Sequence, residues 1–429
     1  MSEWKETTIK ESIFKANTGL DAIKRAPIVQ YDSGIKCLRI QDVSQNNKFE
    51  NWGFCEVTES NYKNFCLKNG DILIARTGNT IGVNLFIDRD LKAVFNNGLI
   101  RLKTINEKIL PKYLFYLFQT SHFKSHIKSI AYGTSTQPNM QIESLLRFSF
   151  RLPPLEEQRA IASVLSCLDE KIENLRRQNE TLESISQTLF KHWFIDFEFP
   201  NDDGKPYKSS GGEVRSTELG EIPKDWRVGK LGDVLSLIID YRGKTPKKLS
   251  SDWSLTGIPA LSAKNIKDGK IIREESMYYV DQDLYNKWMK DELKKHDILL
   301  TSEAPLGEIY YLANNNKYVL SQRLFALRVK NNFSSPYLYQ WLKSEQGQFL
   351  LNRRATGSTV QGIRQVELKK VEIIIPEIEI LEKITKLWFS ILEKMDVNFK
   401  QIKTLTKTRD ELLPKLMSGQ LRVKDEITR

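Results

Sequence analysis

Residues 153–193 read PPLEEQRAIASVLSCLDEKIENLRRQNETLESISQTLFKHW. Apolar residues recur in this stretch at alternating steps of four and three, which is typical of the narrow contact seam of a coiled coil. Pro153 and Pro154, followed by Glu156 and Glu157, indicate a helix start, because proline and negative charge both suit a first helical turn. The predicted seam positions of this helix are Ile161, Leu165, Leu168, Ile172, Leu175, Asn179 and Leu182.

The same pattern returns near the C-terminus at an offset of 223 residues, so that residue 161 corresponds to residue 384. Pro376, Glu377 and Glu379 repeat the start signal. The predicted seam positions of this second helix are Ile384, Trp388, Ile391, Met395, Asn398, Ile402 and Leu405. The chain therefore carries two copies of one long helix, each about 60 Å long if forty residues are helical.

The simplest arrangement of two such helices is an antiparallel pair. Asn179 and Asn398 fall on the two seams, and a buried asparagine can fix the register of a coiled coil because it needs a polar partner. The alternative is that each helix is amphipathic and packs only on its own domain. We favour helix pairing, because the apolar seam is narrow and occurs twice.

The repeat extends beyond the helices. Trp4 is matched by Trp226, and Gly133–Ser135 is matched by Gly357–Thr359, at offsets of 222 and 224. Loop insertions would produce such small changes, and two copies predict a pseudo-symmetric pair and not a solenoid. The expected order is a first domain at 1–152, a long helix at 153–200, a polar linker at 201–221, a second domain at 222–375, and a long helix with a tail at 376–429.

Each domain is predicted to be mixed α/β. Short apolar runs bounded by Gly, Asn, Asp or Pro indicate strands, and they include Asp71–Ala75, Leu99–Leu102, Asp297–Leu300 and Leu324–Val329. Lys112–Ile127 and Pro336–Leu351 look helical. The fold class is thus two α/β domains with two long helices that form an antiparallel coiled coil.

The composition is that of a folded, water-soluble protein, with 40% hydrophobic and 28% charged residues. No apolar run approaches the roughly 18 residues that a membrane span needs, and we expect a cytoplasmic location. The four cysteines are scattered without a CxxC pair. Reduced thiols are therefore expected, and a disulfide scaffold is not.

The net charge of +11 is unevenly distributed. Residues 1–152 carry +7 and residues 222–375 carry +8, whereas residues 153–200 carry −4. Two basic blocks separated by an acidic helix suit binding to a phosphate backbone, which attracts cations regardless of sequence. A merely basic surface would give the same charges, so charge alone leaves both interpretations open.

Motifs of catalysis are missing. Gly243-Lys244-Thr245 has the end of a phosphate-binding loop, but Ile238 stands where the upstream glycine is required. His122 and His126 could share a helix face, yet no third ligand lies near them in sequence, so a metal site is not predicted. These observations favour a binding protein with no catalytic residue, metal or cofactor of its own. A single-chain nuclease or methyltransferase, and a coiled-coil adaptor without DNA readout, are the alternatives.

Four segments resemble the DNA-specificity subunit of type I restriction–modification enzymes. They are LPPLEEQRAIASVLSCLDEKI (Leu152–Ile172), SQTLFKHWFIDFEFP (Ser186–Pro200), GEIPKDW (Gly220–Trp226) and LLPKLMSGQLRV (Leu412–Val423). The second helix departs from the pattern, because its start lacks the double proline and the Glu-Glu-Gln.

The resemblance implies two target recognition domains, each reading one half of a split, asymmetric site in double-stranded DNA. It also implies that the helices set the spacer length and dock two modification subunits and, through them, restriction subunits. S-adenosylmethionine, ATP and Mg²⁺ would then reside on those partner subunits.

Candidate DNA contacts are polar residues in loops, because base edges are read by Arg, Lys, Asn or Gln and phosphates by hydroxyls and amides. The first choices precede the last strand of each domain: Thr134, Ser135, Gln137, Asn139, Ser358, Thr359, Gln361 and Arg364. The second choices are Arg39 and Gln41 with Lys264 and Asn265, and Arg76, Thr77 and Asn79 with Ser302 and Glu303.

Overall fold

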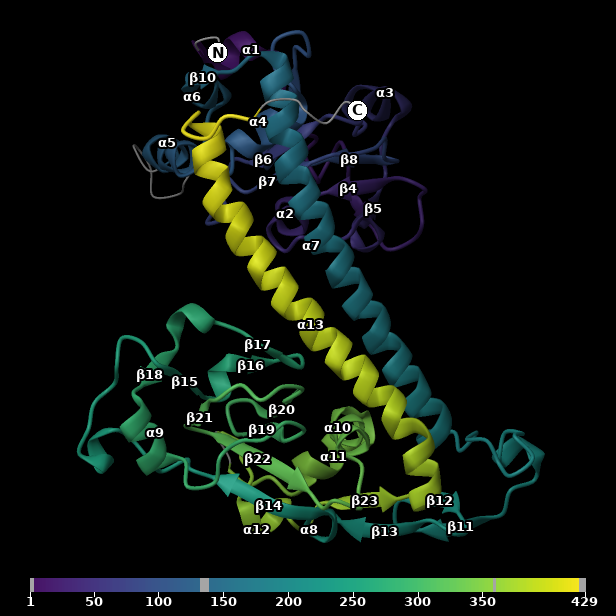
Figure 1. The fold of residues 1–429 in the computed structure, drawn as a ribbon. Helices are drawn as coiled ribbons and strands as arrows, with labels where there is room; N and C mark the ends of the chain where they lie inside the picture. The colour runs from purple at the N-terminus through teal and green to yellow at the C-terminus, as the bar shows by residue number, and fades with distance from the viewer. Residues whose placement is uncertain (1–3, 132–138, 358–359, 424–429) are drawn as a thin grey trace. The chain divides into compact units, whose positions relative to one another are not determined.

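The computed structural model describes residues 4–131, 139–357 and 360–423. The chain forms two compact units, each with one α/β domain and part of each long helix (Figure 1). Unit 1 comprises Met1–Glu173 and Lys403–Arg429, and unit 2 comprises Asn174–Ile402. Within the described ranges, no helix combines the length and the apolar character needed to cross a membrane.

Unit 1 contains two four-stranded sheets. The first is antiparallel and has the order β2 (Ile13–Thr18), β9 (Leu99–Thr104), β6 (Ile72–Ala75), β7 (Asn84–Phe86). The second has the order β3 (Ile28–Val29), β5 (Gly53–Cys55), β4 (Lys36–Leu38), β8 (Ala93–Phe95), with β4 parallel to β8. A two-stranded pair joins β1 (Lys5–Thr8) to β10 (Ser149–Leu152). The short helices are α1 (Ile9–Ser12), α2 (Ile40–Ser44), η1 (Phe49–Asn51), α3 (Glu59–Phe65) and α6 (Ile142–Leu146).

Unit 2 repeats the order of the first sheet, and its second sheet has three strands instead of four. Its antiparallel sheet has the order β14 (Leu235–Asp240), β22 (Leu324–Val329), β19 (Ile298–Ser302), β20 (Leu306–Tyr311). The second sheet has the order β18 (Tyr278–Val280), β15 (Ile258–Leu261), β21 (Val319–Leu320), with β15 parallel to β21. The paired strands are β13 (Arg227–Lys230) with β23 (Glu372–Ile375), and β16 (Ile266–Lys267) with β17 (Lys270–Ile271). The short helices are α8 (Leu231–Val234), η4 (Lys247–Leu249), η5 (Ala263–Asn265), η6 (Glu274–Ser276), α9 (Gln282–Trp288) and α12 (Gln365–Leu368).

A buried carboxylate precedes the equivalent strands β6 and β19. Asp71 is 2.9 Å from the ammonium of Lys103, and Asp297 is 2.7 Å from the guanidinium of Arg328. Both acids are 1% exposed, and a buried charge is tolerated only when it is paired. The repeat seen in the sequence is therefore also a repeat of buried interactions.

The two segments predicted to be helical, one in the second half of each domain, are helical, and each is divided into two helices. Unit 1 has α4 (Pro111–Leu117) and α5 (Ser121–Ala131), and unit 2 has α10 (Ser335–Lys343) and α11 (Glu345–Arg353). The Thr120 hydroxyl accepts a hydrogen bond from the Phe123 amide, and the Ser344 hydroxyl accepts one from Gly347. Each hydroxyl caps a new helix N-terminus and so ends the preceding helix.

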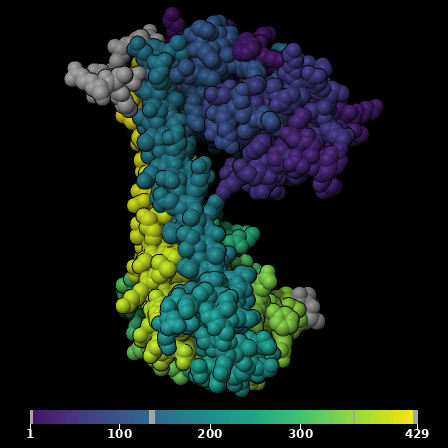
Figure 2. Space-filling model, turned by 90° about the vertical axis from the view of Figure 1, so that its right-hand side faces the viewer, coloured from purple at the N-terminus to yellow at the C-terminus, as the bar shows by residue number. Residues whose placement is uncertain are grey.

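The two long helices are α7 (Leu155–Phe190), which continues into a π-helical turn at Lys191–Ile195, and α13 (Ile378–Met417). They lie side by side in each unit (Figure 2). In unit 1 Arg409 is 2.8 Å from Asp169, and in unit 2 the Asn398 amide donates to Asn179 Oδ1 at 2.8 Å. Because the residue number rises along α7 as it falls along α13, the pair is antiparallel.

The predicted seam residues are all buried or half-buried. The buried ones are Ile161, Leu165, Ile172, Leu175, Asn179, Ile384, Trp388, Ile391 and Asn398, and the half-buried ones are Leu168, Leu182, Met395, Ile402 and Leu405. The first turns of each helix also enter a domain core: Ile161 and Leu165 in unit 1, Ile384 and Trp388 in unit 2. Each seam thus serves both helix pairing and packing on a domain.

The segment expected to be a plain linker contains regular structure. After α7, η3 (Lys208–Ser210) is followed by a hairpin of β11 (Val214–Thr217) and β12 (Gly220–Pro223). The Tyr207 ring stacks on Phe199 with centroids 4.6 Å apart. Polar, glycine-rich composition indicated surface exposure, but it did not reveal this hairpin.

Candidate nucleic-acid interface

In unit 1, the loop after β6 lies against the segment that leads to α6. Arg76 donates from Nη2 to Asn139 Oδ1 at 3.1 Å, and Thr77 forms an isolated antiparallel bridge with Asn139. Asn79 is exposed in the same loop. The structure thus brings together two groups of candidates that are more than 60 residues apart. Thr134, Ser135 and Gln137 lie outside the described residues.

Unit 2 brings the equivalent loops together in the same way. Glu303 forms an antiparallel bridge with Gly362, and the Ile363 amide donates to the Ser302 carbonyl at 2.9 Å. Gln361 and Arg364 are exposed beside this contact. Ser302 is 1% exposed, so its hydroxyl does not reach the surface. Ser358 and Thr359 lie outside the part of the chain that the structure describes.

The remaining candidates sit on one short turn in each unit. The Arg39 amide donates to the Asp42 carboxylate at 3.0 Å, and the Ser262 amide donates to Asn265 Oδ1 at 3.1 Å. Asn265 is 1% exposed and its side chain closes the turn, so it is not placed to contact a ligand. Gln41 and Lys264, at the equivalent place in each turn, are exposed.

Two arginines at the same rim of unit 2 were missed from the sequence. Arg323 is 3.1 Å from Glu303, and Arg242 is 2.8 Å from Asp240 with its guanidinium 4.0 Å from the centre of the Phe325 ring. Arg323 directly precedes the predicted strand Leu324–Val329, and that position was the usable signal. Arg323 has a φ of 64°, a left-handed conformation that is uncommon for a non-glycine residue and is often found at functional loops.

The lysine of Gly243-Lys244-Thr245 is used inside the fold. Its ammonium donates to the Trp288 carbonyl at 2.6 Å and lies 4.2 Å from the centre of the Tyr241 ring. Burial, together with the nearby charge of Lys290, lowers the pKa of Lys244. These contacts give the lysine a structural role in this conformation.

The two histidines considered as metal ligands pack on an aromatic ring. The centroids of His122 and His126 are 4.9 and 5.1 Å from that of Phe148, and His126 Nε2 is 3.2 Å from the Ser144 carbonyl oxygen. Among the described residues, no group of three or more potential ligands is close enough to hold a metal ion.

Residues of the Leu152–Ile172 segment join α7 to its domain. The Gln158 side chain is fully buried, accepts a hydrogen bond from the Leu110 amide, and donates to the carbonyls of Lys108 and Pro153. Leu381 stands at the equivalent place in α13. The segment that carries the family resemblance is therefore a docking element between helix and domain.

Comparison with known proteins agrees with this architecture. The family model described as the type I restriction modification DNA specificity domain matches twice, at residues 1–184 and 223–408. The MjaIX specificity subunit of Methanocaldococcus jannaschii, a type I restriction enzyme subunit, is 32% identical over 326 residues, which cover 74% of this chain and 70% of the relative. The HindI specificity subunit of Haemophilus influenzae is 26% identical over 482 residues, which cover 98% of this chain and all of the relative.

A solved structure shares the fold. The crystal structure of the type I restriction–modification system S subunit from M. genitalium superposes with a TM-score of 0.64 at 17% identity, over 96% of each chain. Specificity subunits confer sequence choice on partner enzymes and are not themselves catalytic. The two matches of the family model, which together span most of the sequence, show that this chain belongs to the DNA-specificity subunits of type I restriction–modification systems.

Proposed function

We propose that unit 1 and unit 2 each read one half of a split, asymmetric site in double-stranded DNA. The observation that carries the proposal is that the two units share the strand order of their antiparallel four-stranded sheets but differ in the polar residues at equivalent rims. Arg76 and Asn139 meet at this rim in unit 1, and Arg323 and Glu303 meet there in unit 2. Two domains with similar sheets but different polar side chains at the rim are suited to bind two different base sequences.

The long helices set the spacer between the half-sites in this proposal. With 36 and 40 residues, α7 and α13 have lengths of about 54 and 60 Å, which exceed one turn of DNA at roughly 34 Å. They also dock two modification subunits, which bring the restriction subunits. S-adenosylmethionine, ATP and Mg²⁺ belong to those partners, and the complex works in the cytoplasm.

Competition binding by the complex with modification subunits tests the proposal. One split sequence should outcompete all others, and inserting or deleting a single base pair in its spacer should remove the preference. A protein that binds every duplex equally, or that tolerates any spacer length, would contradict the proposal and favour an adaptor that does not read DNA.

A further inference from the structure

A short turn carries Arg39 in unit 1 and Ser262 in unit 2, and the strand beside it presents different residues in the two units. The strand preceding the turn is β4 in unit 1 and β15 in unit 2, and its antiparallel neighbour is β5 or β18. Cys37 pairs with Gly53 across the first ladder, and Ala260 pairs with Tyr278 across the second. Because Cys37 and Ala260 hold equivalent places beside the parallel strands β8 and β21, Gly53 is the counterpart of Tyr278.

In unit 2, this place holds a supported cation. The Tyr278 ring stacks on Trp253 with centroids 4.9 Å apart and an angle of 22°. The Lys264 ammonium lies 5.4 Å from the centre of the Tyr278 ring and 3.5 Å from the Ser276 carbonyl oxygen. A cation over an aromatic face is attracted by the ring electrons, so Tyr278 restricts where the ammonium can point.

In unit 1, the same place holds a different cation. Gly53 has no side chain, and a β-carbon added there would lie 3.6 Å from Arg39 Nη2 and 3.7 Å from Cζ. The guanidinium thus lies next to the place from which a side chain at residue 53 would extend. Arg39 Nε donates to Asp42 at 3.2 Å, which orients it, and the lysine position of the turn is the uncharged Gln41.

The exchange is reciprocal. Unit 2 combines a small Ser262, a cationic Lys264 and a large Tyr278, whereas unit 1 combines a large cationic Arg39, a neutral Gln41 and Gly53. Each set of residues therefore holds one oriented cation at the equivalent place of the fold, Lys264 in unit 2 and Arg39 in unit 1. The two half-sites differ in base sequence but have the same phosphate backbone. A cation that contacts the backbone is therefore expected in both units, whereas a residue that reads a base is not.

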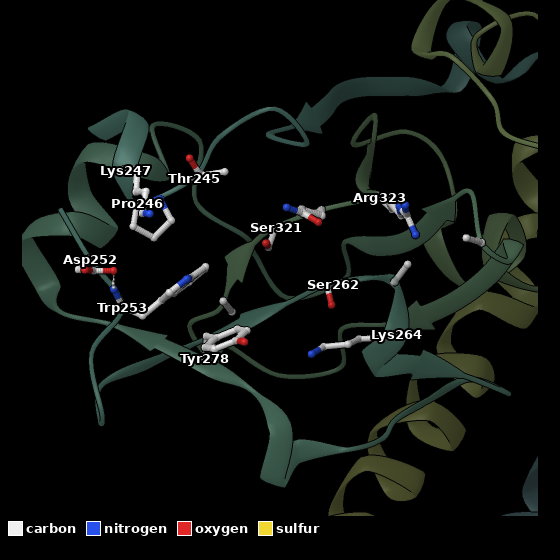
Figure 3. A pocket seen from close by; sticks show the side chains of 14 residues that line it. Thr245, Pro246, Lys247, Asp252, Trp253, Ser262, Lys264, Tyr278, Ser321 and Arg323 are labelled. Atoms are coloured by element: carbon white, nitrogen blue, oxygen red, sulfur yellow. Dashed lines mark hydrogen bonds between the residues drawn. The ribbon is translucent and has the colours of Figure 1, made fainter. Parts of the chain in front are cut away.

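A cavity adjoins the cation in unit 2. Its volume is about 490 Å³, and its charged lining residues are Lys247, Asp252, Lys264 and Arg323. Lys264 and Tyr278 extend toward each other on one side, with Thr245 and Arg323 on the other (Figure 3). The Asp252 carboxylate accepts a hydrogen bond from the Trp253 amide. Three cations, one carboxylate and the hydroxyls of Thr245, Ser262 and Ser321 suit an anionic, oxygen-rich ligand.

We propose that Lys264 and Arg39 each bind a phosphodiester group of the DNA backbone, at equivalent places on the two half-sites, and that Tyr278 is a positioning residue for Lys264. The inference rests on the proposed function and deepens it. It separates Lys264 and Arg39, which anchor the DNA, from rim residues that read bases.

The salt dependence of binding tests the anchor. Log affinity falls as log salt concentration rises, and each phosphate contact contributes about −0.9 to the slope of that line. Lys264→Ala, in the complex with modification subunits, should reduce the magnitude of that slope by about 0.9 on cognate and unrelated duplexes alike, and leave sequence preference unchanged. Lys287→Ala, an exposed lysine of α9 in the same unit, is the matched control and should leave the slope unchanged.

Two further variants test positioning and equivalence. Tyr278→Phe keeps the ring and should retain the wild-type slope, whereas Tyr278→Leu should reduce the magnitude of the slope. In the Lys264→Ala background, Tyr278→Leu should cause no further change of the slope, because the ammonium that it positions is absent. In unit 1, Arg39→Ser should reduce the magnitude of the slope, and the triple variant Arg39→Ser, Gln41→Lys, Gly53→Tyr should restore it by installing the arrangement of unit 2.

Failure of this inference is distinguishable from failure of the proposed function. If the wild-type complex prefers one split sequence but Lys264→Ala keeps the wild-type slope, or loses no more than Lys287→Ala, the anchor is overturned and half-site reading stands. If the wild-type complex shows no sequence preference, the proposed function fails, and the slopes still decide whether Lys264 touches a phosphate.

Discussion

Each unit packs an equivalent tryptophan, Trp4 or Trp226, against the segment that follows one of the long helices, but the contacts differ in their chemistry. In unit 1, Trp4 donates from Nε1 to Glu157 at 3.0 Å, and the Arg422 guanidinium lies 5.4 Å from the centre of the Trp4 ring while it pairs with Glu157. In unit 2, Trp226 stacks on Phe199 at 4.9 Å. Phe199 and Arg422 are 223 residues apart, the same offset as the helices.

The comparison shows that the repeat preserves the position of this contact more strictly than the residue types that form it. Trp226 is 1% exposed in an aromatic cluster with Phe194, Phe197 and Phe199. Trp4 is half-buried and depends on a hydrogen bond and an ion pair. The stability of the Trp226 contact in unit 2 should therefore depend on apolar burial, and the stability of the Trp4 contact in unit 1 should change with salt concentration.

The largest expected effect is that of removing the buried ring. Trp226→Ala should lower the free energy of unfolding of unit 2 by about 3–5 kcal/mol, the usual loss for a core aromatic. Trp4→Ala should cost unit 1 clearly less, because that ring is only half-buried. Hydrogen exchange resolved by peptide, with β13 and β1 as reporters, separates the two units. An equal or larger loss in Trp4→Ala would contradict the comparison.

The next effect concerns the polar docking contact of Gln158 in unit 1, whose equivalent place in unit 2 holds the buried, apolar Leu381. Gln158→Leu should destabilise unit 1 by about 1–3 kcal/mol, because the Leu110 amide and the Lys108 carbonyl lose their partner in a buried place. Faster exchange should appear at the start of α4 and not of α10. The reverse change, Leu381→Gln, should not stabilise unit 2, and a gain there would mean that the two docking contacts are interchangeable.

The asparagine pair sets the third comparison. Asn398→Leu leaves Asn179 Oδ1 without its donor and should cost about 1–3 kcal/mol, whereas the double variant with Asn179→Leu should recover that loss, since both side-chain amides are then gone. The double variant should also tolerate spacers one base pair longer or shorter, because the polar contact that fixes helix register is absent. Unchanged spacer preference would show that register is set elsewhere.

The smallest effect is that of the terminal ion pair. Arg422→Ala should destabilise unit 1 by about 1 kcal/mol at low salt, and the difference from wild type should shrink at 1 M salt, since this pair is partly exposed. Thermal melting at two salt concentrations measures it. A salt-independent loss would indicate that Arg422 acts through packing on Trp4 alone.

Much of the fold followed from periodicity. The seam from Ile161 to Leu182, its copy at 223 residues, and the strands at Ile72–Ala75 and Leu324–Val329 were predictable because burial on one face imposes a period on the sequence. The breaks at Thr120 and Ser344 were missed, although a hydroxyl in the middle of a helical pattern is a capping signal.

The site was less predictable, for a physical reason. The equivalence of Gly53 and Tyr278 depends on strand pairing between residues that are distant in sequence, and the repeat changes from an offset of 223 at Arg39 to 225 at Gly53. Unequal loops therefore conceal the match. The correspondence between Tyr278 and the guanidinium of Arg39 is visible in the structure but not in an alignment of the two repeats.

The central claim is that two homologous units read two half-sites independently, and exchanging one unit tests it most directly. Residues 1–152 can be replaced by the corresponding block of a relative, and the bases methylated by the assembled modification complex can then be mapped across a genome. The account predicts that one half of the methylated sequence changes while the other half and the spacer stay the same. A change in both halves, or in neither, would contradict it.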